Sequence, residues 1–339
     1  MNLRRRARAL AATGSSVLIT LFGLVLVTFL IGRVMPIDPV IAIVGDHAPA
    51  DVIEQVRNQL GLDRPLLVQF WIYFRNLLHG DLGRSVMTSN TVVADIAHFF
   101  PATIELATVA IIVATLTGVP LGVWAAVRQG TRTDHIVRIV CLTGQSVPIF
   151  LLGLLALLIF YATLGWAPGT GRQDVMFEGD VPVVTGFLTV DSLLAGNWEA
   201  FHDALAHLLL PAGVLAWFSM AYITRMTRAF MLDALAGEYI ITARAKGLSA
   251  MRVVWRHAFG NIAVRLITVL ALTYAGLLEG AVVTETVFSW PGLGQYLTVS
   301  LLSADMNAVL GATLVIGVSY LALNLLADVL YRLLDPRAR

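Results

Sequence analysis

The stretch Glu238–Asn261 holds the residues of this sequence that are best suited to bind a partner. It reads EYIITARAKGLSAMRVVWRHAFGN and lies between two long apolar segments. Arg244, Lys246 and Arg252 can form charge-assisted hydrogen bonds with acidic groups of another protein. A basic amphipathic loop could instead rest on anionic lipid. The chemistry expected here is ion pairing, with either a protein or the membrane surface.

Catalytic motifs are missing from the sequence. It has no GxxxxGK[ST] phosphate loop, no HExxH and no GxSxG, and its seven histidines are scattered. The single cysteine, Cys141, cannot form a disulfide within the chain. We therefore expect no catalytic residue, bound cofactor or metal in this chain. This pattern favours a transporter or channel over a membrane enzyme, which would need clustered catalytic groups at one surface.

Composition indicates an integral membrane protein. The 339 residues are 58% hydrophobic and 13% charged, whereas soluble domains carry roughly a quarter charged residues. Six segments are apolar for about 20 residues, the length of a membrane-spanning helix. They cover residues 15–35, 102–126, 137–162, 208–229, 263–287 and 309–333. We predict an all-α fold with six transmembrane helices, the first of them retained rather than cleaved as a signal peptide.

The distribution of basic residues predicts the orientation in the membrane. Most of the 23 Arg and Lys residues fall on one side if the N-terminus is cytoplasmic, as the positive-inside rule requires. Both termini and the stretch 238–261 are then in the cytoplasm. We divide the chain into 1–100, a first helix with an external segment, and 101–339, a five-helix core that contains this cytoplasmic loop.

The two longer external segments differ in character. Segment 36–100 has two short helical patterns, Asp51–Leu60 and Pro65–Leu78, closed by Gly61 and Gly80. Segment 163–207 is acidic, with Arg172 as its only basic residue. It could dock a partner, although we favour a solvated loop.

Local signals within 238–261 predict a helix, a glycine turn and a second helix. Glu238–Lys246 is rich in helix formers, and Gly247 is placed as a helix stop. Ser249 is placed as the N-cap of the second helix, and Leu248 with Val253 could form a hydrophobic staple around it.

Charged and small residues inside the apolar segments are the remaining candidates. Glu279 lies within the fifth span, where it could line a water-filled path or hydrogen-bond inside the bundle. Glu285 lies near the outer end of that span and is expected to shape the outer loop.

Other charged residues lie near the ends of the spans. Arg128 and Arg225 can reach water from the helix ends, and Glu105 can do so at the outer start of the second span. Two GxxxG patterns, Gly118–Gly122 and Gly276–Gly280, allow close helix packing within the chain or against a second subunit.

The stretch EYIITARAKGLS (238–249) resembles the EAA loop of permeases of binding-protein-dependent ABC importers, in its dipeptide/oligopeptide/nickel form. The general EAA pattern has Glu-Ala-Ala at the positions that Ile241-Thr242-Ala243 occupy here. It has Ile-x-Leu-Pro at the positions of His257-Ala258-Phe259-Gly260. Both departures from the general pattern are usual in this branch. Five further stretches resemble the same branch in order: LGLDRPLLVQF (60–70), GDLGRS (80–85), PATIELA (101–107), ETVFSWPGLG (285–294) and NLLADVLYRLLDPR (324–337).

The resemblance implies a type I ABC importer permease fold in a bacterial cytoplasmic (inner) membrane. The loop would form a coupling helix in a cleft of an ATPase subunit. The implied partners are a second similar permease, two ATPase subunits that hold ATP and Mg, an external solute-binding protein and the lipid bilayer, with no nucleic acid. The implied coupling residues are Glu238, Thr242, Ala243, Arg244, Lys246, Gly247, Leu248, Ser249 and Arg252, and Glu285, Pro291 and Gly292 would shape an outer gate.

Two questions stay open at this point. The substrate could be a peptide, nickel, glutathione, an opine or an oligosaccharide, and the permease pair could be formed by identical or different chains. A secondary transporter or channel driven by an ion gradient is the alternative. It would need a relay of carboxylates and inverted repeats with interrupted helices, and neither is evident in the sequence.

Overall fold

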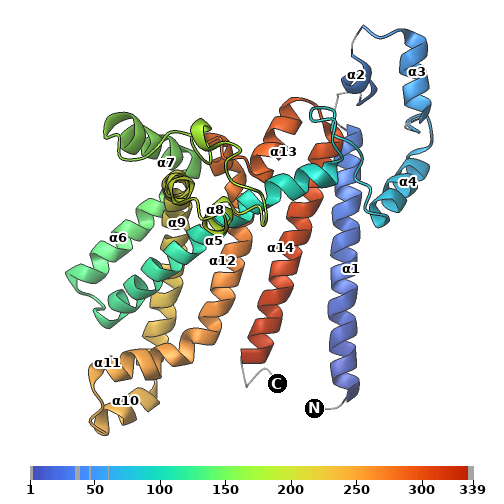
Figure 1. Ribbon diagram of the computed structural model, residues 1–339. Helices are drawn as coiled ribbons and strands as arrows, with labels where there is room; N and C mark the ends of the chain where they lie inside the picture. Colours follow the sequence, from blue (N-terminus) through green and yellow to red (C-terminus); the bar gives the residue numbers. More distant parts are fainter. Residues whose placement is uncertain (1–2, 35–38, 46, 60, 335–339) are drawn as a thin grey trace. The chain divides into compact units, whose positions relative to one another are not determined.

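The computed structural model describes residues 3–34, 39–45, 47–59 and 61–334, and within them the chain is helical with no strand (Figure 1). The described residues form two compact units. The first contains the chain up to Ala102 and Pro291–Leu321, and the second contains Thr103–Trp290 and the chain from Ala322 onward. The helices are α1 Leu3–Val34, α2 Pro39–Val44, α3 Ala50–Gln59, α4 Leu66–Leu78, α5 Val92–Val127, α6 Arg132–Ser146, α7 Ile149–Ala156, α8 Leu188–Leu194, α9 Trp198–Leu235, α10 Glu238–Ala245, α11 Ala250–Arg252, α12 Gly260–Val287, α13 Leu293–Leu302 and α14 Met306–Leu334.

The number of membrane spans agrees with the prediction. Five described segments are long and apolar enough to cross a membrane: Gly14–Gly32, Val92–Val127, Trp198–Leu235, Ala250–Val287 and Met306–Leu330. A sixth is the pair α6 and α7 with its π-helical continuation to Thr163, if this bent pair counts as one span. The all-α membrane architecture predicted from composition is therefore confirmed.

The third span is not the continuous helix predicted over 137–162. It bends by 101° between Ser146 and Ile149. Val147 is extended, with φ −97° and ψ 129°, and Pro148 occupies the N-cap position of α7. A proline side chain clashes with a helical conformation of the preceding residue, and the ring itself is tolerated at a helix start. Pro148 therefore ends one helix and begins the next.

Helices α5 and α9 are much longer than the apolar segments from which they were predicted. They have 36 and 38 residues, where the predicted spans covered 102–126 and 208–229. Hydropathy detects only the part of a helix inside hydrocarbon. The additional turns of α5 lie before the predicted span and include Asp95 and His98, whereas those of α9 lie at both ends. Helix α9 also continues through Pro211.

The first unit contains the short external helices that the sequence predicted. Helices α3 and α4 match the patterns at 51–60 and 65–78, and the glycines that close them have positive φ, 65° at Gly61 and 76° at Gly80. The stretch after Gly80 is held by Asp305, which is fully buried. This carboxylate accepts hydrogen bonds from the Ser85 hydroxyl at 2.5 Å and the Val86 amide at 2.7 Å.

In the second unit, segment 163–207 is tied down by Arg172. Its guanidinium donates to the Glu105 carboxylate at 2.5 Å and to the Gly186 carbonyl at 2.7 Å. Glu105 also accepts bonds from the amide and hydroxyl of Thr189. The Glu105 residue is 4% exposed, so the expectation that it reaches water was wrong. Its partners lie 67 and 84 residues away, too far for a local pattern to show.

Asp191 fixes the same segment from within. Burial by itself raises the pKa of this carboxyl. Hydrogen bonds from the Thr185 hydroxyl and from the amides of Thr185, Val184 and Gly186 outweigh that effect, so the pKa of Asp191 lies below its usual value. The carboxylate therefore stabilises the turn when ionised, and this stabilisation is lost only as the pH falls through the lowered pKa. The segment is a folded element rather than a simple solvated loop.

The core of the second unit is built on α9, which contacts α6, α7, α8 and α12. The pattern Gly118–Gly122 on α5 packs against α9 within this chain. A Cβ at Gly122 would lie 2.7 Å from the Thr224 carbonyl oxygen, and one at Gly118 would lie 3.2 Å from the Met220 carbonyl. A Cβ at Gly276 or Gly280 would meet no heavy atom within 4 Å among the described residues. Among the residues that the structure describes, only the first pattern allows close packing of two helices.

We predict that Gly122→Ala separates α5 from α9 and destabilises the protein by about 1–3 kcal/mol, the usual cost of overpacking. The measurement is the thermal midpoint of the purified protein in detergent. Gly280→Ala is the matched control and should leave the midpoint unchanged, because its added methyl group enters open space. Equal midpoints for the two variants would contradict the close packing of α5 on α9.

Candidate functional site

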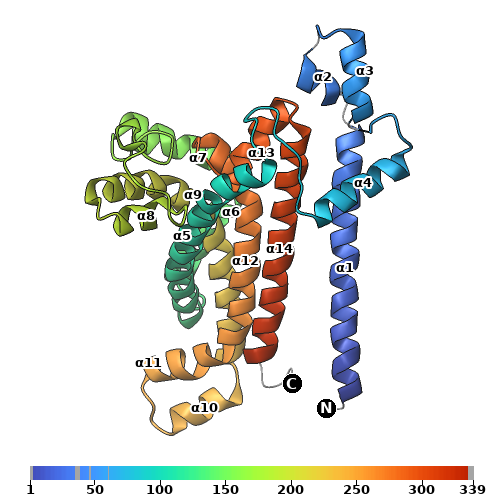
Figure 2. The same ribbon diagram turned by 45° about the vertical axis from the view of Figure 1, so that its right-hand side comes forward.

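The predicted partner-binding stretch forms a hairpin of two short helices at the end of α9 and α12. Helix α10 and helix α11 project together beyond these long helices (Figure 2). After α11, a π-helical stretch, Val253–Phe259, runs directly into α12. We call residues 238–259 the coupling hairpin.

Gly247 makes the turn of this hairpin, as predicted. Its φ is 74°, a left-handed conformation that glycine adopts without strain. The Gly247 amide donates to the Arg244 carbonyl at 2.9 Å, and the Leu248 amide donates to the Ala243 carbonyl at 3.3 Å. These two bonds form a Schellman motif, which satisfies the last carbonyls of α10. No atom lies within 4 Å of a Cβ placed at Gly247, so only the backbone conformation restricts this position.

The second half of the hairpin agrees with the sequence only in part. Ser249 occupies the N-cap position of α11, but its side chain makes no capping hydrogen bond. The regular part of this helix is the single turn Ala250–Arg252, and the chain then becomes π-helical. Leu248 and Val253 pack in one apolar cluster, as the predicted staple requires.

One face of the hairpin is buried against its own chain. Ile240, Ala243, Val253 and Ala258 are at most 6% exposed and pack on the ends of α5, α9 and α12. The Tyr239 hydroxyl adds a bond to the Ala234 carbonyl at 2.9 Å. Ala243 therefore supports the hairpin from inside and offers no contact surface to a partner.

The opposite face is exposed and combines apolar tips with positive charge. Ile241 and Met251 are 68% and 70% exposed. The predicted contact residues Glu238, Thr242, Arg244, Lys246, Ser249 and Arg252 are exposed as well. Arg244, Lys246 and Arg252 form no ion pair within the described part of the chain. The hairpin therefore presents cations and large apolar side chains that are exposed and form no ion pair within the residues that the structure describes.

Sequence reasoning missed Ile241 and Met251 as surface residues. Both are apolar, and nothing in the local pattern separates them from buried neighbours such as Ile240 and Val253. The distinction arises because the turn at Gly247 folds one face of each short helix onto α9. One signal for the buried face was available in the sequence: Ile240 and Ala243 are three positions apart, which places them on the same face of a helix.

The two carboxylates of α12 have different surroundings. Glu285 is fully buried, accepts a hydrogen bond from the Thr103 hydroxyl at 2.7 Å, and through its carbonyl accepts the Trp290 amide at 2.8 Å. Glu279 is exposed and has no hydrogen bond or ion pair within the described residues. After α12 the chain passes through Pro291, and Gly292 is the N-cap residue of α13. The roles expected for these residues stay predictions.

A groove of about 400 Å³ lies between α9, α12 and the break that separates α6 from α7. Gly276 and Gly280 lie along it, which explains why a Cβ there would meet open space. The groove is otherwise lined by polar and apolar side chains, namely Gln145, Ile149, Leu215, Phe218, Ser219, Tyr222, Leu272, Thr273 and Leu277. The sequence did not assign this groove, because it depends on the bend at Pro148.

We expect Glu285→Ala to destabilise the protein by about 2 kcal/mol or more, because it leaves the buried Thr103 hydroxyl without its acceptor. Glu279→Ala, which removes an exposed side chain, should leave stability within about 0.5 kcal/mol of the parent. Thermal midpoints in detergent provide the comparison. A midpoint lowered more by the change at Glu279 would refute this account of the two carboxylates.

Comparison with known proteins gives matches over most of the chain. Residues 118–339 match the family described as "Binding-protein-dependent transport system inner membrane component", and residues 7–107 match its N-terminal counterpart, "Binding-prot-dependent transport system membrane comp, N-term". The probable D,D-dipeptide transport system permease protein DdpB of Escherichia coli K12 is 44% identical over 93% of this chain and 92% of its own length. The di/tripeptide transport system permease protein DppB of Pseudomonas aeruginosa UCBPP-PA14 is 41% identical, and the dipeptide transport system permease protein DppB of Escherichia coli K12 is 40% identical, each over 94% of this chain and 95% of its own length.

Proposed function

The chain belongs to the family of inner membrane components of binding-protein-dependent transport systems, and from that premise we propose that it is the permease subunit of an ATP-driven importer of short peptides. The observation that carries the proposal is identity of 40–44% over more than nine-tenths of the chain to three permeases named for dipeptides or tripeptides. The chain is a multi-pass protein of a bacterial inner membrane and a transport subunit rather than an enzyme.

ATP is hydrolysed by separate ATPase subunits, which the coupling hairpin contacts from the cytoplasmic side. Two features support this step. The sequence lacks a phosphate loop, and the hairpin exposes Arg244, Lys246 and Arg252 beside the apolar side chains of Ile241 and Met251. A partner with acidic groups around an apolar cleft fits this surface. ATP and Mg are therefore bound by the partner, and no cofactor is bound by this chain.

The complete importer contains a second similar permease, two ATPase subunits and an external solute-binding protein. The family description itself names dependence on a binding protein. The open groove at Gly276 and Gly280 supports a permease pair, because a Cβ at either glycine meets no heavy atom within 4 Å among the described residues and a second chain could pack there. We place the substrate path at this groove, which each permease would line in part.

The groove has the polar groups that a peptide needs. Peptide amides require hydrogen-bond partners when they leave water. Gln145, Ser219, Tyr222 and Thr273 supply an amide and three hydroxyl groups along the groove. Glu279 lies on the same helix as Gly276 and Gly280 and is exposed. Its carboxylate could attract the amino terminus of a passing peptide.

Motion of the hairpin can reach this groove through continuous helices. The π-helical stretch Val253–Phe259 joins the hairpin to α12 without a loop. Val253 and Ala258 also pack on residues of α5 and α9. Closure of the ATPase subunits would therefore displace the cytoplasmic ends of the helices that line the groove, and ATP would bias two arrangements of the bundle.

The alternative, transport driven by an ion gradient, has weaker support. A proton or ion relay needs several carboxylates at membrane depth. In α12 Glu285 is buried and accepts a hydrogen bond from Thr103. Glu279 forms no hydrogen bond with another carboxyl group among the described residues. The exposed cationic hairpin would also have no role in such a transporter.

We predict that Gly247→Pro abolishes peptide uptake and leaves membrane insertion intact. Proline fixes φ near −65° and removes the amide that bonds Arg244, so the turn cannot form and the hairpin loses the shape that contacts the ATPase. Uptake by proteoliposomes and ATPase activity stimulated by loaded binding protein are the measurements. Both should fall to background in the assembled variant.

Gly247→Asn is the matched control. Asparagine adopts the left-handed conformation more readily than other non-glycine residues, and a side chain here meets no neighbour. It should keep at least about half of the parent uptake, since the strain of a left-handed non-glycine residue is about 1–2 kcal/mol at most. Normal stimulated ATPase activity in assembled Gly247→Pro would overturn the proposed role of the hairpin.

A further inference from the structure

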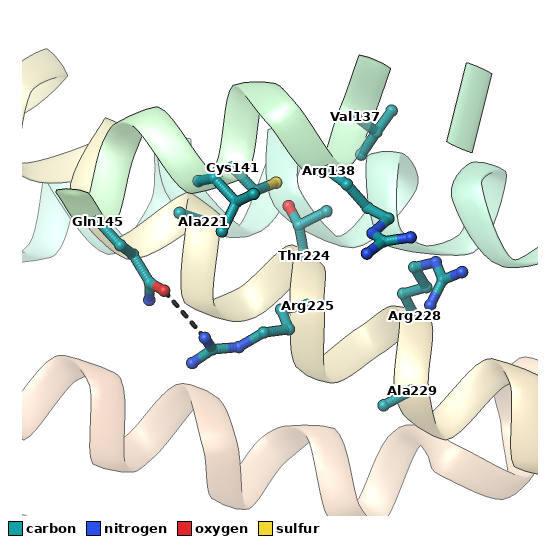
Figure 3. Close-up of a pocket in the computed structure, with 10 residues that line it drawn as sticks. Val137, Arg138, Cys141, Gln145, Ala221, Thr224, Arg225, Arg228 and Ala229 are labelled. Atoms are coloured by element: carbon teal, nitrogen blue, oxygen red, sulfur yellow. Dashed lines mark hydrogen bonds between the residues drawn. The ribbon is translucent and has the colours of Figure 1, made fainter. Parts of the chain in front are cut away.

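A second cavity, of about 250 Å³, lies between α6 and α9. It is distinct from the groove at Gly276, although Gln145 borders both. Arg138 enters it from α6, and Arg225 and Arg228 enter it from α9 (Figure 3). The residues that line it include three arginines and no carboxylate. The proposed function gives none of these arginines a role.

One of the three arginines is neutralised within the chain. Arg228 donates through Nε to one oxygen of Asp134 at 2.7 Å and through a terminal nitrogen to the other at 2.8 Å. Asp134 is 1% exposed and also accepts the Gly130 amide at 3.0 Å. This bidentate pair fixes the start of α6 to α9. It leaves Arg138 and Arg225 to define the charge of the cavity.

Neither Arg225 nor Arg138 forms an ion pair of its own among the residues that the structure describes, although Arg138 lies close enough to the Asp134 carboxylate for an electrostatic interaction. The Arg225 guanidinium donates to the Gln145 side-chain oxygen at 3.0 Å and lies 5.5 Å from the centre of the Tyr222 ring. The Arg138 guanidinium makes no hydrogen bond within the described chain. Gln145 and Tyr222 orient Arg225 without neutralising it. The three arginines of the cavity and the single carboxylate of Asp134 therefore leave a net charge of +2.

The depth of Arg225 corresponds to the lipid headgroups of the cytoplasmic leaflet. Helix α9 has 38 residues, which is about 57 Å at 1.5 Å per residue. Centred on about 30 Å of hydrocarbon, it would extend about 13 Å beyond each side. Arg225 precedes the cytoplasmic end of α9, Leu235, by about 15 Å of helix. Its guanidinium is therefore close to the boundary where phosphate groups begin.

The walls of the cavity are apolar. Val137, Cys141 and Leu142 line it from α6, and Ala221 and Ala229 line it from α9. Leu142 is 59% exposed, and Ile139 beside it on α6 is 60% exposed. A small soluble anion would satisfy the arginines but leave these apolar walls in water. A ligand with a negative head and an apolar tail satisfies both.

We propose that this cavity binds an anionic phospholipid of the cytoplasmic leaflet. Arg138 and Arg225 hold the phosphate, since guanidinium groups pair well with its oxygens. An acyl chain runs along Leu142 and Ile139. Basic pockets between membrane helices on the cytoplasmic side recognise anionic headgroups in this way. The lipid then clamps α6 to α9 beside the Asp134–Arg228 pair.

The test compares lipid retention by the complete transporter in nanodiscs. One preparation contains phosphatidylcholine alone, and the other contains phosphatidylcholine with phosphatidylglycerol. Native mass spectrometry counts the phosphatidylglycerol that stays bound. Arg138→Gln combined with Arg225→Gln should weaken retention strongly, by about five-fold for each charge removed. Arg132→Gln, which removes an exposed charge from the same helix outside the cavity, should retain lipid as the parent does.

A second readout uses Cys141, the only cysteine of the chain, which lines the cavity. Phosphatidylglycerol should slow its alkylation by a maleimide, measured on the peptide that contains it, and phosphatidylcholine alone should not. The Arg138 and Arg225 changes should remove this protection even if they do not alter overall stability. Equal lipid retention in the double variant and in Arg132→Gln would overturn the proposal. Protection of Cys141 by dipeptide instead of lipid would also overturn it, because the cavity would then belong to the transport path.

Discussion

The packing of the coupling hairpin onto its own chain is the contact on which the rest of the account depends. Ile240, Ala243, Val253 and Ala258 are buried on the ends of α5, α9 and α12. Burial of each large apolar side chain contributes about 1.5–3 kcal/mol. Because both short helices bury one face, both must expose the other. Without that packing, Ile241, Arg244 and Met251 would form a mobile basic loop rather than a surface of fixed shape.

Charge is arranged differently at the two ends of the second unit. On the external side two buried carboxylates have partners: Glu105 forms an ion pair with Arg172, and Glu285 accepts a hydrogen bond from Thr103. On the cytoplasmic side Arg228 is likewise paired with buried Asp134. The hairpin cations Arg244, Lys246 and Arg252, by contrast, are exposed and form no ion pair in the described chain. Buried pairs fix an element in place, because removing one partner leaves an uncompensated charge. Exposed cations remain free to bind other molecules. The second unit is therefore fixed by buried pairs at both ends, and its inner end also presents exposed cations.

Local signals in the sequence predicted much of this fold. Apolar runs predicted the spans, basic residues predicted the orientation, and Gly247 predicted the turn of the hairpin. The break at Pro148 was also readable, since proline disfavours a helical residue before it, but the long apolar run concealed it. Contacts between distant residues were not predictable: the burial of Glu105 depends on Arg172, and the exposure of Met251 depends on how α10 and α11 fold onto α9. The division into 1–100 and 101–339 and the roles of Pro291 and Gly292 stay predictions.

The most direct test of the central claim is photo-crosslinking from the exposed face of the hairpin. A benzophenone amino acid replaces Met251 in the assembled transporter, and a second preparation carries it at Ile139, which is similarly exposed but lies on α6. We predict that position 251 crosslinks to an ATPase subunit and that position 139 does not. The absence of a crosslink from position 251 to an ATPase subunit, in an assembly that hydrolyses ATP and imports peptide, would contradict the proposed contact of the hairpin with that subunit.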